Sequence, residues 1–524
     1  MGEKLDTTTE TAVPECPSHK ILEENKPSTA RVSRILIVAL DNYIISTALP
    51  QITSQFHGLE LAGWYSSSYF LTLMAFQPAF GQLCSLFPVK TVLLASISIF
   101  EIGTVLSAAA PNSAVFLAGR LISGAAGGGL WCGSLTVMSL AAEPRKRHLY
   151  ISIVTSMYGV ASVAGPLLGG IFTDSPTLTW RFCFWINLPI GGLAFLIILL
   201  VLPAGKTAGP ENKQPVLQRL ASIDFVGIVL LSGIFICLLL SLQWGGTTYP
   251  WSDSIIWGCL IGVGLMAAVF VVLQLRLGDR AMIPPRIVSK RTSAAGCLFT
   301  VLITMGIVTH VYYLPFYFQS AVGISASESG DRLLAYLMVL LFTPMIAGSL
   351  VTLMGHYVPF MLLGCALFTI GAGLLTTLEP DSSPAAWIGF QVLAALGAGM
   401  CRQMAFTAVP LVLRPEDLPT ATALVAFCNS VGSALALGIG QAVFNQFLSR
   451  ELRENLPGID VQSISHAGAA EVFRLVPAAE LPALQLAFNV AISRTFILAV
   501  ASGGLAFCTS VSMDWINVKK HGGH

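Results

Sequence analysis

Long apolar stretches alternate with short polar segments along almost the whole chain. A helix needs about 20 mostly apolar residues to cross the hydrocarbon core of a bilayer. Stretches near this length recur along the sequence, and the short connections between most of them predict antiparallel neighbouring helices. The predicted spans cover residues 34–50, 62–83, 90–110, 115–141, 149–172, 182–202, 224–242, 255–273, 293–316, 330–353, 358–377, 385–408, 419–444 and 491–513. The pattern predicts an all-α integral membrane protein of about fourteen transmembrane helices.

Composition agrees with this prediction and excludes several other classes of protein. Of 524 residues, 54% are hydrophobic and only 10% are charged, and the mean hydropathy is +0.75. A soluble domain carries about 25% charged residues, because its surface faces water. The net charge of +1 gives no basic footprint for nucleic acid. Most of the 11 cysteines lie in apolar runs and none forms a CxxC pair, so we expect neither a disulfide framework nor a metal site.

The sequence offers no motif for nucleotide hydrolysis or for enzymatic catalysis. It contains no Walker A motif, and no Ser/His/Asp or paired-carboxylate pattern stands out in a polar segment. The tails and loops are too small to hold an enzyme domain. We therefore expect a non-enzymatic protein without a cofactor, which works as a monomer in a lipid bilayer. The partners we expect are protons and a small-molecule substrate.

Lysines and arginines in the loops predict the orientation of the chain, because they favour the cytoplasmic side. With the N-terminus inside, thirteen of them fall in inner loops and five in outer loops. An even number of spans then places the C-terminus inside as well. We expect a multi-pass protein of the plasma membrane, with a vacuolar or vesicle membrane as the alternatives.

A weak internal repeat predicts two equivalent halves. The segments 81–90 and 348–357, which follow the second and tenth predicted spans, share a glycine, a small hydroxyl residue and a helix breaker at the same offsets. Spans seven and eight are then an insertion between two six-helix halves. The predicted parts are a disordered tail (1–33), the N-terminal half (34–202), a linker with two extra helices (203–292), the C-terminal half (293–513) and a cytoplasmic tail (514–524).

The C-terminal half contains one long outer loop, predicted at residues 445–490. Periodic apolar residues at 466–476 and 479–493 predict two short helices that lie on the membrane surface. The alternative is a solvated loop.

Three ionisable residues inside predicted spans lie at about the same depth, where a charge is costly and needs a reason. Asp41, Glu101 and Arg120 are each about nine or ten residues from the outer end of their span, or roughly 13–15 Å below the outer face. An isolated carboxylic acid there has a raised pKa, and a nearby guanidinium lowers it. Such a group can bind and release a proton during transport. The alternative is a static ion pair that fixes helix register.

Two further stretches are candidates for the transport pathway. The fifth span contains Gly165, Pro166, Gly169 and Gly170, which allow close helix packing and a bend. Simple packing by small residues is the alternative. The aromatic run 312–319 contains Tyr313, Phe316 and Gln319, which we expect to wall a cavity for flat apolar ligands. An interfacial aromatic belt explains that run equally well.

Six motifs carry a resemblance to a known family. They are Leu40–Pro50, Gly119–Gly124, Ala161–Gly170, Trp180–Gly191, Gln243–Trp251 and Asp417–Ala423. On these motifs the chain resembles the major facilitator superfamily, specifically the 14-spanner drug:proton antiporters and, within them, fungal exporters of toxic secondary metabolites. The resemblance extends over nearly the whole chain from about residue 34. It implies a twelve-helix core with two extra helices, and proton-coupled export of a small apolar compound such as a toxin, a secondary metabolite or a drug.

The resemblance also assigns roles to particular residues. Arg120 matches the arginine of the family's span 4 motif, to which proton coupling is assigned. Residues 161–170 resemble the antiporter motif of span 5, with Ala161 in place of its first glycine. The family's loop after span 2 has an acidic residue and basic residues that latch the two halves together. Here Ser85 stands at the acidic position and only Lys90 is basic, so we expect a weak or absent latch.

The first predicted span is shorter than the family pattern. Its apolar run from Ile35 to Leu49 gives about 22 Å of helix, against a hydrocarbon core about 30 Å thick. We therefore expect this sequence to transport poorly unless the span is extended. Two alternatives to export stay open, namely an importer or facilitator of siderophores or amino acids, and an impaired copy that does not transport.

Overall fold

The computed structural model describes seven main ranges of the chain, which are 62–141, 178–202, 223–245, 249–324, 326–414, 417–456 and 480–517. Isolated positions are described at 52, 55, 56, 161, 165, 168, 169, 172, 173, 175, 215 and 218. The predicted span 34–50 lies outside the described residues, and so does most of the span 149–172. The expectation that the short first span limits transport therefore stays a prediction.

The described ranges are almost entirely helical, and their one pairing of extended backbone is an isolated bridge between Gly245 and Tyr249. The long helices are α3 (Ala62–Leu86), α4 (Val89–Ala108), α5 (Ser113–Ala141), α8 (Asn187–Val201), α10 (Phe225–Trp244), α11 (Ser254–Leu277), α13 (Arg291–Phe316), α14 (Ala326–Met354), α15 (Val358–Leu375), α16 (Pro384–Cys401), α18 (Leu418–Asn455) and α21 (Leu481–Val511). Short helical segments are α7 (Phe182–Trp185), η2 (Gly278–Arg280), α12 (Pro285–Val288), η3 (Tyr317–Ala321) and α17 (Ala405–Leu411).

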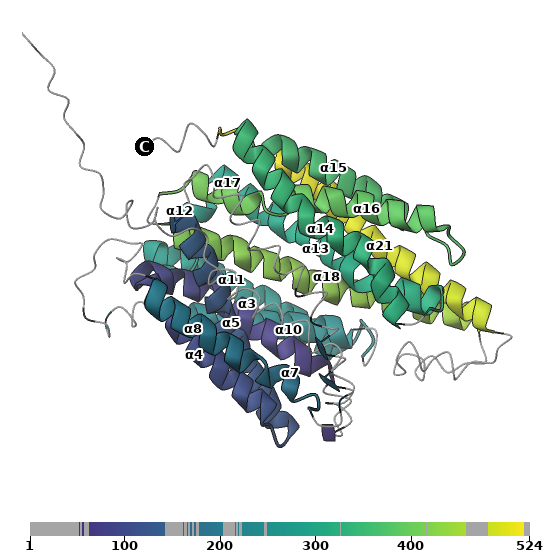
Figure 1. The fold of residues 1–524 in the computed structure, drawn as a ribbon, viewed down its shortest axis with the longest axis horizontal. Coiled ribbons are helices and arrows are strands. Elements are labelled where there is room, and N and C mark those ends of the chain that lie inside the picture. The colour runs from purple at the N-terminus through teal and green to yellow at the C-terminus, as the bar shows by residue number, and fades with distance from the viewer. Residues whose placement is uncertain are drawn as a thin grey trace, which may run out of the picture.

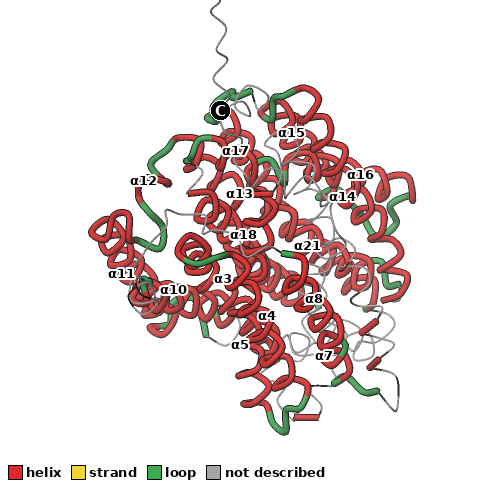
Figure 2. Tube along the Cα trace, turned by 60° about the vertical axis from the view of Figure 1, so that its left-hand side comes forward, coloured by secondary structure: helices red, strands yellow, loops and turns green. Residues whose placement is uncertain are grey.

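Two groups of helices pack side by side (Figure 1). The N-terminal group consists of α3, α4, α5, α7 and α8, and the C-terminal group consists of α13 to α18 together with α21. Helix α18 packs against both α13 and α21 of its own group and against α3 and α5 of the other. Helices α10 and α11 pair with each other at one edge of the bundle, where α10 also contacts α3 and α18 (Figure 2).

Eleven helical segments of the described ranges are long and apolar enough to cross a membrane. Their burial separates central helices from peripheral ones. In the most apolar window of α5, 83% of the residues are buried inside the protein, against 11% in α11. Helix α3 is also long, but Ser68, Gln77 and Gln82 interrupt its apolar sequence. A helix that is apolar on all sides and exposed, such as α11, has lipid as its solvent.

The loop predicted at residues 445–490 is shorter in the structure. Helix α18 continues to Asn455, eleven residues past the predicted end of its span, and α21 begins at Leu481, ten residues before the predicted start. The stretch 479–493 is therefore not a separate surface helix, because it forms the first turns of α21. Leu484 and Phe488 give it apolar periodicity, and they are buried in a cluster that includes Phe444 of α18. The other predicted surface helix, 466–476, lies outside the described residues.

Candidate functional site

Arg120 is a buried cation in a membrane-spanning helix. It lies seven residues after the start of α5, and its side chain is 1% exposed. Its guanidinium carbon is 4.5 Å from the ring centroid of Tyr69 on α3 and 5.9 Å from that of Phe184 on α7. A desolvated cation over an aromatic face gains about 2 kcal/mol. These two rings therefore help to hold the charge inside the span.

Close backbone contact between α4 and α5 fixes where Arg120 lies. A Cβ atom added to Gly103 would come within 2.6 Å of the backbone nitrogen of Ser123, and one added to Gly119 would overlap the hydroxyl of Ser107. Only glycine allows two helices to pack this tightly. The antiparallel register of the pair is set by these contacts.

This register corrects the prediction that Glu101 and Arg120 share one depth, and the depth of Asp41 stays a prediction. Because Gly103 lies opposite Ser123, Glu101 lies level with position 125, five residues beyond Arg120 along α5. Five residues correspond to about 7.5 Å along a helix axis, which is more than one turn. The number of residues from the turn does not give this offset, because the contacts of Gly103 and Gly119 set how α4 and α5 are aligned.

Glu101 and Arg120 both lie against the segment that contains α7 and α8, and the positions they contact, 191 and 184, are seven residues apart. Arg120 lies near Phe184, whereas the Glu101 carboxylate occupies the space beside Gly191, where a Cβ atom would overlap it. Glycine at position 191 is therefore what lets a carboxylate enter the contact between α4 and α8.

Helices α3 and α18 join the two groups along an antiparallel contact. Small residues and short polar side chains make it, so the backbones approach closely. Gly81 lies beside Ala423. The hydroxyl oxygens of Ser85 and Thr420 are 3.1 Å apart. The hydroxyl of Ser430 donates to Gln77 Oε1 at 2.8 Å.

The weak or absent charged latch was expected from Ser85 and Lys90, and these two residues make different contacts. Lys90 donates to the backbone oxygen of Leu199 at 2.8 Å, within its own helix group. Ser85, at the position where the family has an acidic residue, instead forms a hydroxyl pair with Thr420 across the groups. Uncharged contacts thus replace an ion pair at this point.

The segment between α11 and α13 adds a charged clasp at the same end. Arg286 donates two hydrogen bonds of 2.7 Å to the carboxylate of Asp417, just before α18, and one of 2.6 Å to Asp279. The hydrogen bond to Asp417 raises the pKa of Arg286 above its ordinary value. Gln82 of α3 donates to the backbone oxygen of Arg280 at 3.0 Å. This linker segment therefore touches both helix groups.

A second polar network ties the linker segment to the extra helix pair. Asp224 caps α10 by accepting from the backbone nitrogen of Gly227 at 2.7 Å, and it accepts from Gln274 Nε2 of α11 at 2.5 Å. The oxygen of the same Gln274 side chain accepts from the backbone nitrogen of Ile283 at 3.0 Å. Buried amide and carboxylate groups of this kind are costly unless paired, so the network fixes the linker segment against α10 and α11.

The family model described as Major Facilitator Superfamily matches residues 35–313 and 296–450. This chain belongs to the Major Facilitator Superfamily. The two matched ranges together cover most of the described helices, and the superfamily fold accounts for the two helix groups.

Several fungal relatives are similar over most of their length. This superfamily member is 41% identical over 485 residues to the MFS-type efflux pump MFS1 of Trichophyton rubrum, covering 93% of this chain and 90% of the relative. It is 42% identical to the MFS-type transporter ltbE of Aspergillus luteorubrus, covering 93% and 89%. It is 36% identical to the efflux pump roqT of Penicillium rubens, again covering 93% and 89%.

Solved structures of other members share the fold. The human organic anion transporter MFSD10 has a TM-score of 0.58 at 14% identity, covering 93% of this chain and 100% of that one. The transporter FucP in its outward conformation has a TM-score of 0.55 at 12% identity, covering 93% and 98%. These likenesses show the fold, and the family match together with the apolar helices identifies a multi-pass membrane protein.

Opposite the clasp, each helix group of this superfamily member has its own aromatic cluster. Tyr65, Phe116, Trp180 and Phe184 pack edge to face in the N-terminal group, with ring centroids 5.3–6.1 Å apart. The register of α3 against α18 places Tyr65 near the level of residue 442. Among the described residues, neither this hydrophobic cluster nor the one beside residue 442 includes a member of the other group.

The C-terminal cluster contains two of the three predicted cavity residues. Tyr313 is 1% exposed, and its ring is 5.7 Å from Phe444 and 6.1 Å from Phe316. Gln319 lies apart from these rings, and its side-chain nitrogen is 3.5 Å from the hydroxyl of Ser329 on α14. A short π-helical segment, η3, carries Gln319 there. The structure therefore brings Tyr313 and Phe316 together but directs Gln319 elsewhere.

Some predicted site residues are not described. Asp41, Pro166 and Gly170 lie outside the described residues, so their roles stay predictions. Gly165 and Gly169 are described as helical and buried. Their place in a helix agrees with the predicted fifth span, and their part in antiport is untested.

The Arg286–Asp417 pair was not predicted from the sequence. In the sequence, Arg286 was counted only as one of thirteen positive charges in inner loops. Asp417 was noted only as the first residue of a family motif. The two are 131 residues apart, and no periodic pattern links such distant charges. One available signal was that Asp417 immediately precedes an apolar span, where an unpaired carboxylate near lipid is unfavourable.

Proposed function

We propose that this transporter exports a small apolar organic molecule, such as a toxin, a secondary metabolite or a drug, in exchange for protons. Its fungal relatives carry the names efflux pump and MFS-type transporter, which supports export. The structural observation that carries the coupling is the buried Arg120 between Tyr69 and Phe184. A charge kept inside a span is a functional group by default.

Asp41 and Arg120 form the proton-coupling pair in this proposal, with Glu101 as a second carboxyl group. When the carboxyl group is ionised, the guanidinium attracts it, and when it is protonated that attraction falls. Protonation therefore changes the free energy of one conformation relative to the other. Glu101, which faces α8, responds to movement of α8 against α4.

We also propose the organisation of the chain that the sequence predicts. The chain divides into halves at 34–202 and 293–513, with the extra helices in 203–292 between them and both termini cytoplasmic. The end of α3 and the start of α18 then lie on the cytoplasmic side. The contact between these helices closes that side, and the separate aromatic clusters flank a pathway open to the outside. Residues 165–170 support the bend in the fifth span that export requires.

A vesicle experiment tests this function. The purified full-length protein is reconstituted into liposomes, a pH gradient of either sign is imposed, and uptake or loss of rhodamine 6G and other apolar dyes is followed by fluorescence. Export coupled to protons predicts dye movement against the proton flux, abolished by a protonophore. Movement in the direction of the proton flux indicates an importer, and movement indifferent to the gradient indicates a facilitator.

A further inference from the structure

The connection between α11 and α13 carries an excess of positive charge. Residues 276–291 contain five arginines and lysines but a single carboxylate, Asp279. The whole chain has a net charge of only +1, so this excess is local. Arg286 has Asp279 and Asp417 as its partners in the clasp. Four other cations remain, which together form the cationic patch: Arg276, Arg280, Lys290 and Arg291.

The cationic patch is exposed and has no carboxylate partner among the described residues. All four of its residues are exposed to solvent or lipid. The ion pairs that the described part of this segment forms belong to Arg286. Asp514, a carboxylate near the start of α13, accepts a hydrogen bond from the hydroxyl of Thr292. Cations gathered in so short a segment repel one another, and an anion that binds them relieves this repulsion.

The linker segment is held flat against the ends of the helices. Membrane-spanning helical segments end at Arg280 and begin again at Arg291, so residues 281–290 alone join them. Met282 and Ile287 are 1% and 0% exposed, because they pack into apolar clusters of the helices beneath. The backbone oxygen of Arg280 also accepts from Gln82 of α3 at 3.0 Å. The cationic patch therefore stays at the bilayer surface, where lipid headgroups lie.

Exposed apolar side chains lie next to the cationic patch. Leu275 in the last turn of α11 is 63% exposed, and Val288 of α12 is 37% exposed. Only 11% of the most apolar window of α11 is buried, so this helix faces lipid on most of its surface. Exposed apolar residues beside cations are typical of surfaces that meet acyl chains and anionic headgroups together. A soluble anion would match the charges but not the apolar residues.

We propose that the cationic patch binds the headgroups of anionic phospholipids, such as phosphatidylserine, in the leaflet beside the end of α11. The phosphate oxygens of these lipids accept charge-assisted hydrogen bonds from guanidinium and ammonium groups. The patch selects by charge and not by headgroup shape, because its side chains form an exposed surface. This binding does not depend on what the protein transports.

Lipid retention tests this proposal. The full-length protein is placed in nanodiscs with equal amounts of phosphatidylserine, phosphatidylglycerol and phosphatidylcholine and extracted in mild detergent at low ionic strength. Its bound lipids are then measured by native mass spectrometry. Phosphatidylserine and phosphatidylglycerol should be retained alike, and both in preference to phosphatidylcholine. High salt during extraction should reduce this preference, because it screens exposed charges.

Paired variants assign the preference to the cationic patch. Arg276→Gln with Arg280→Gln, and separately Lys290→Gln with Arg291→Gln, should each lower the ratio of anionic to neutral lipid at least about fivefold, the effect of one cation near an anionic surface. Changing two cations at a time leaves most of the charges that orient the chain. Arg276→Lys with Arg280→Lys keeps both charges and should keep the preference.

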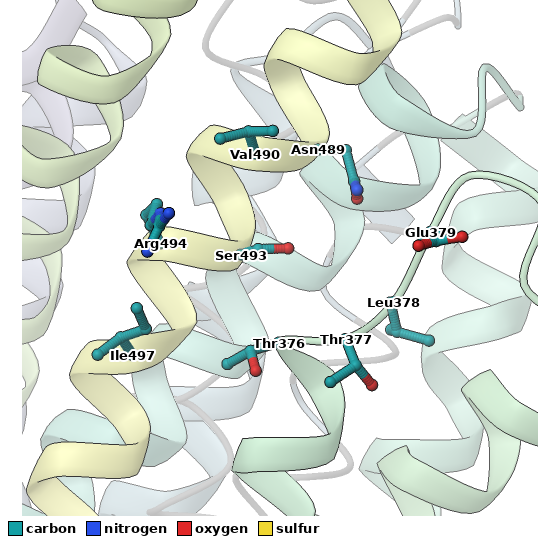
Figure 3. Close-up of a pocket in the computed structure, with 9 residues that line it drawn as sticks. All are labelled: Thr376, Thr377, Leu378, Glu379, Asn489, Val490, Ser493, Arg494 and Ile497. Carbon is teal, nitrogen blue, oxygen red and sulfur yellow. The ribbon is translucent and has the colours of Figure 1, made fainter.

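Two exposed arginines at the other end of the C-terminal group provide the matched control. Figure 3 shows Arg494 projecting from α21 beside a pocket that the loop after α15 also lines. Tyr317, which follows α13 at the end remote from the patch, donates to the backbone oxygen of Glu379 in that loop. Arg450 lies near the end of α18. Arg450→Gln with Arg494→Gln removes the same charge as each neutral pair and should leave the preference unchanged.

Three results would overturn the proposal. The first is equal retention of phosphatidylcholine by the wild type. The second is an unchanged preference in both neutral pairs of the patch, or an equal loss in the control pair. The third is displacement of the bound lipid by free glycerophosphoserine, which would assign the patch to soluble anions instead.

Discussion

The two ends of the α3–α18 contact are built from different kinds of residue. At the clasp end, glycine, serine and threonine pack across the two helix groups beside the Arg286–Asp417 pair. At the aromatic end, large rings such as Tyr313 and Phe116 pack within a single group. Contacts between the two groups at the clasp end are small and polar, whereas the aromatic contacts within each group bury much apolar area.

The magnitudes agree with this division. Each hydrogen bond across the groups contributes about 0.5–1.5 kcal/mol, and a partly exposed ion pair contributes about 0–1 kcal/mol. The clasp end therefore stabilises the closed contact by only a few kcal/mol. Two conformations separated by a few kcal/mol can be interchanged by ligand binding or protonation. Burying one large aromatic side chain is worth about as much as the whole clasp.

The largest effect is expected from Arg120, which lies between the two ends. Arg120→Ala should abolish proton-driven efflux, because the proposed coupling site then loses its cation. Arg120→Lys should retain part of the activity, since lysine keeps the charge but lacks the planar fork. Efflux in pH-gradient liposomes measures both. Full activity in Arg120→Ala would remove this residue from coupling.

A bulky residue at the α3–α18 contact should have nearly as large an effect. Gly81→Leu would collide with Ala423 and hold the clasp end apart, so transport should fall at least about tenfold while the protein still inserts. Gly264→Leu is the control, because nothing lies within 4 Å of a Cβ at that position. If both variants transport equally well, the contact does not need to close.

Breaking the clasp should have a moderate effect. Arg286→Gln or Asp417→Asn should change the transport rate by about two- to fivefold, as expected for a partly exposed ion pair. Exchanging the two residues, as Arg286→Asp with Asp417→Arg, should restore part of the rate. A double-mutant cycle on transport rates measures the coupling, and additive effects of the single changes would exclude a direct interaction.

The contribution of Arg286 to the clasp should not change with pH in the neutral range. Its pKa is raised in the folded protein, so this contribution is complete below the ordinary arginine value and is lost only above the raised value. The ratio of wild-type to Arg286→Gln rates should therefore stay constant between about pH 6 and pH 9. A ratio that falls toward one across this range would contradict the assignment.

The smallest effect is expected at the aromatic end. Tyr313→Phe should leave thermal stability almost unchanged or slightly raised, because the Tyr313 hydroxyl has no partner among the described residues. Tyr313→Ala should lower stability by about 3–5 kcal/mol, the usual cost of removing a buried ring. Thermal unfolding in detergent measures both. A large loss of transport in Tyr313→Phe at normal stability would place the hydroxyl in the substrate pathway.

The sequence predicted most of the fold because lipid imposes a simple rule on span length. Span positions such as 358–377 agree closely with α15, which is Val358–Leu375. Span length did not predict where α18 ends and α21 begins, because both helices continue past their predicted spans. The pattern around Phe488 arises from packing against α18 rather than from lying on a membrane surface, and periodicity alone does not separate these causes.

The candidate site was less predictable. Arg120 was identifiable from the cost of a charge in a span, and its burial agrees with that argument. The offset of Glu101 depends on which glycines touch between α4 and α5, and the pairing of Arg286 with Asp417 depends on how distant segments meet. Both are properties of packing between helices, which a single sequence leaves open.

Helix α18 has a mechanical consequence. It runs for 38 residues without a proline beyond its first turn, from the clasp to the aromatic cluster of Phe444. At 1.5 Å per residue it is a rod about 57 Å long, so a tilt of about 10° about one end displaces the other by about 10 Å. If α18 moves as one rigid body, a change at the clasp end displaces the aromatic end as well. Distances from a spin label at each end of α18 to a reference label on the N-terminal group should then change together.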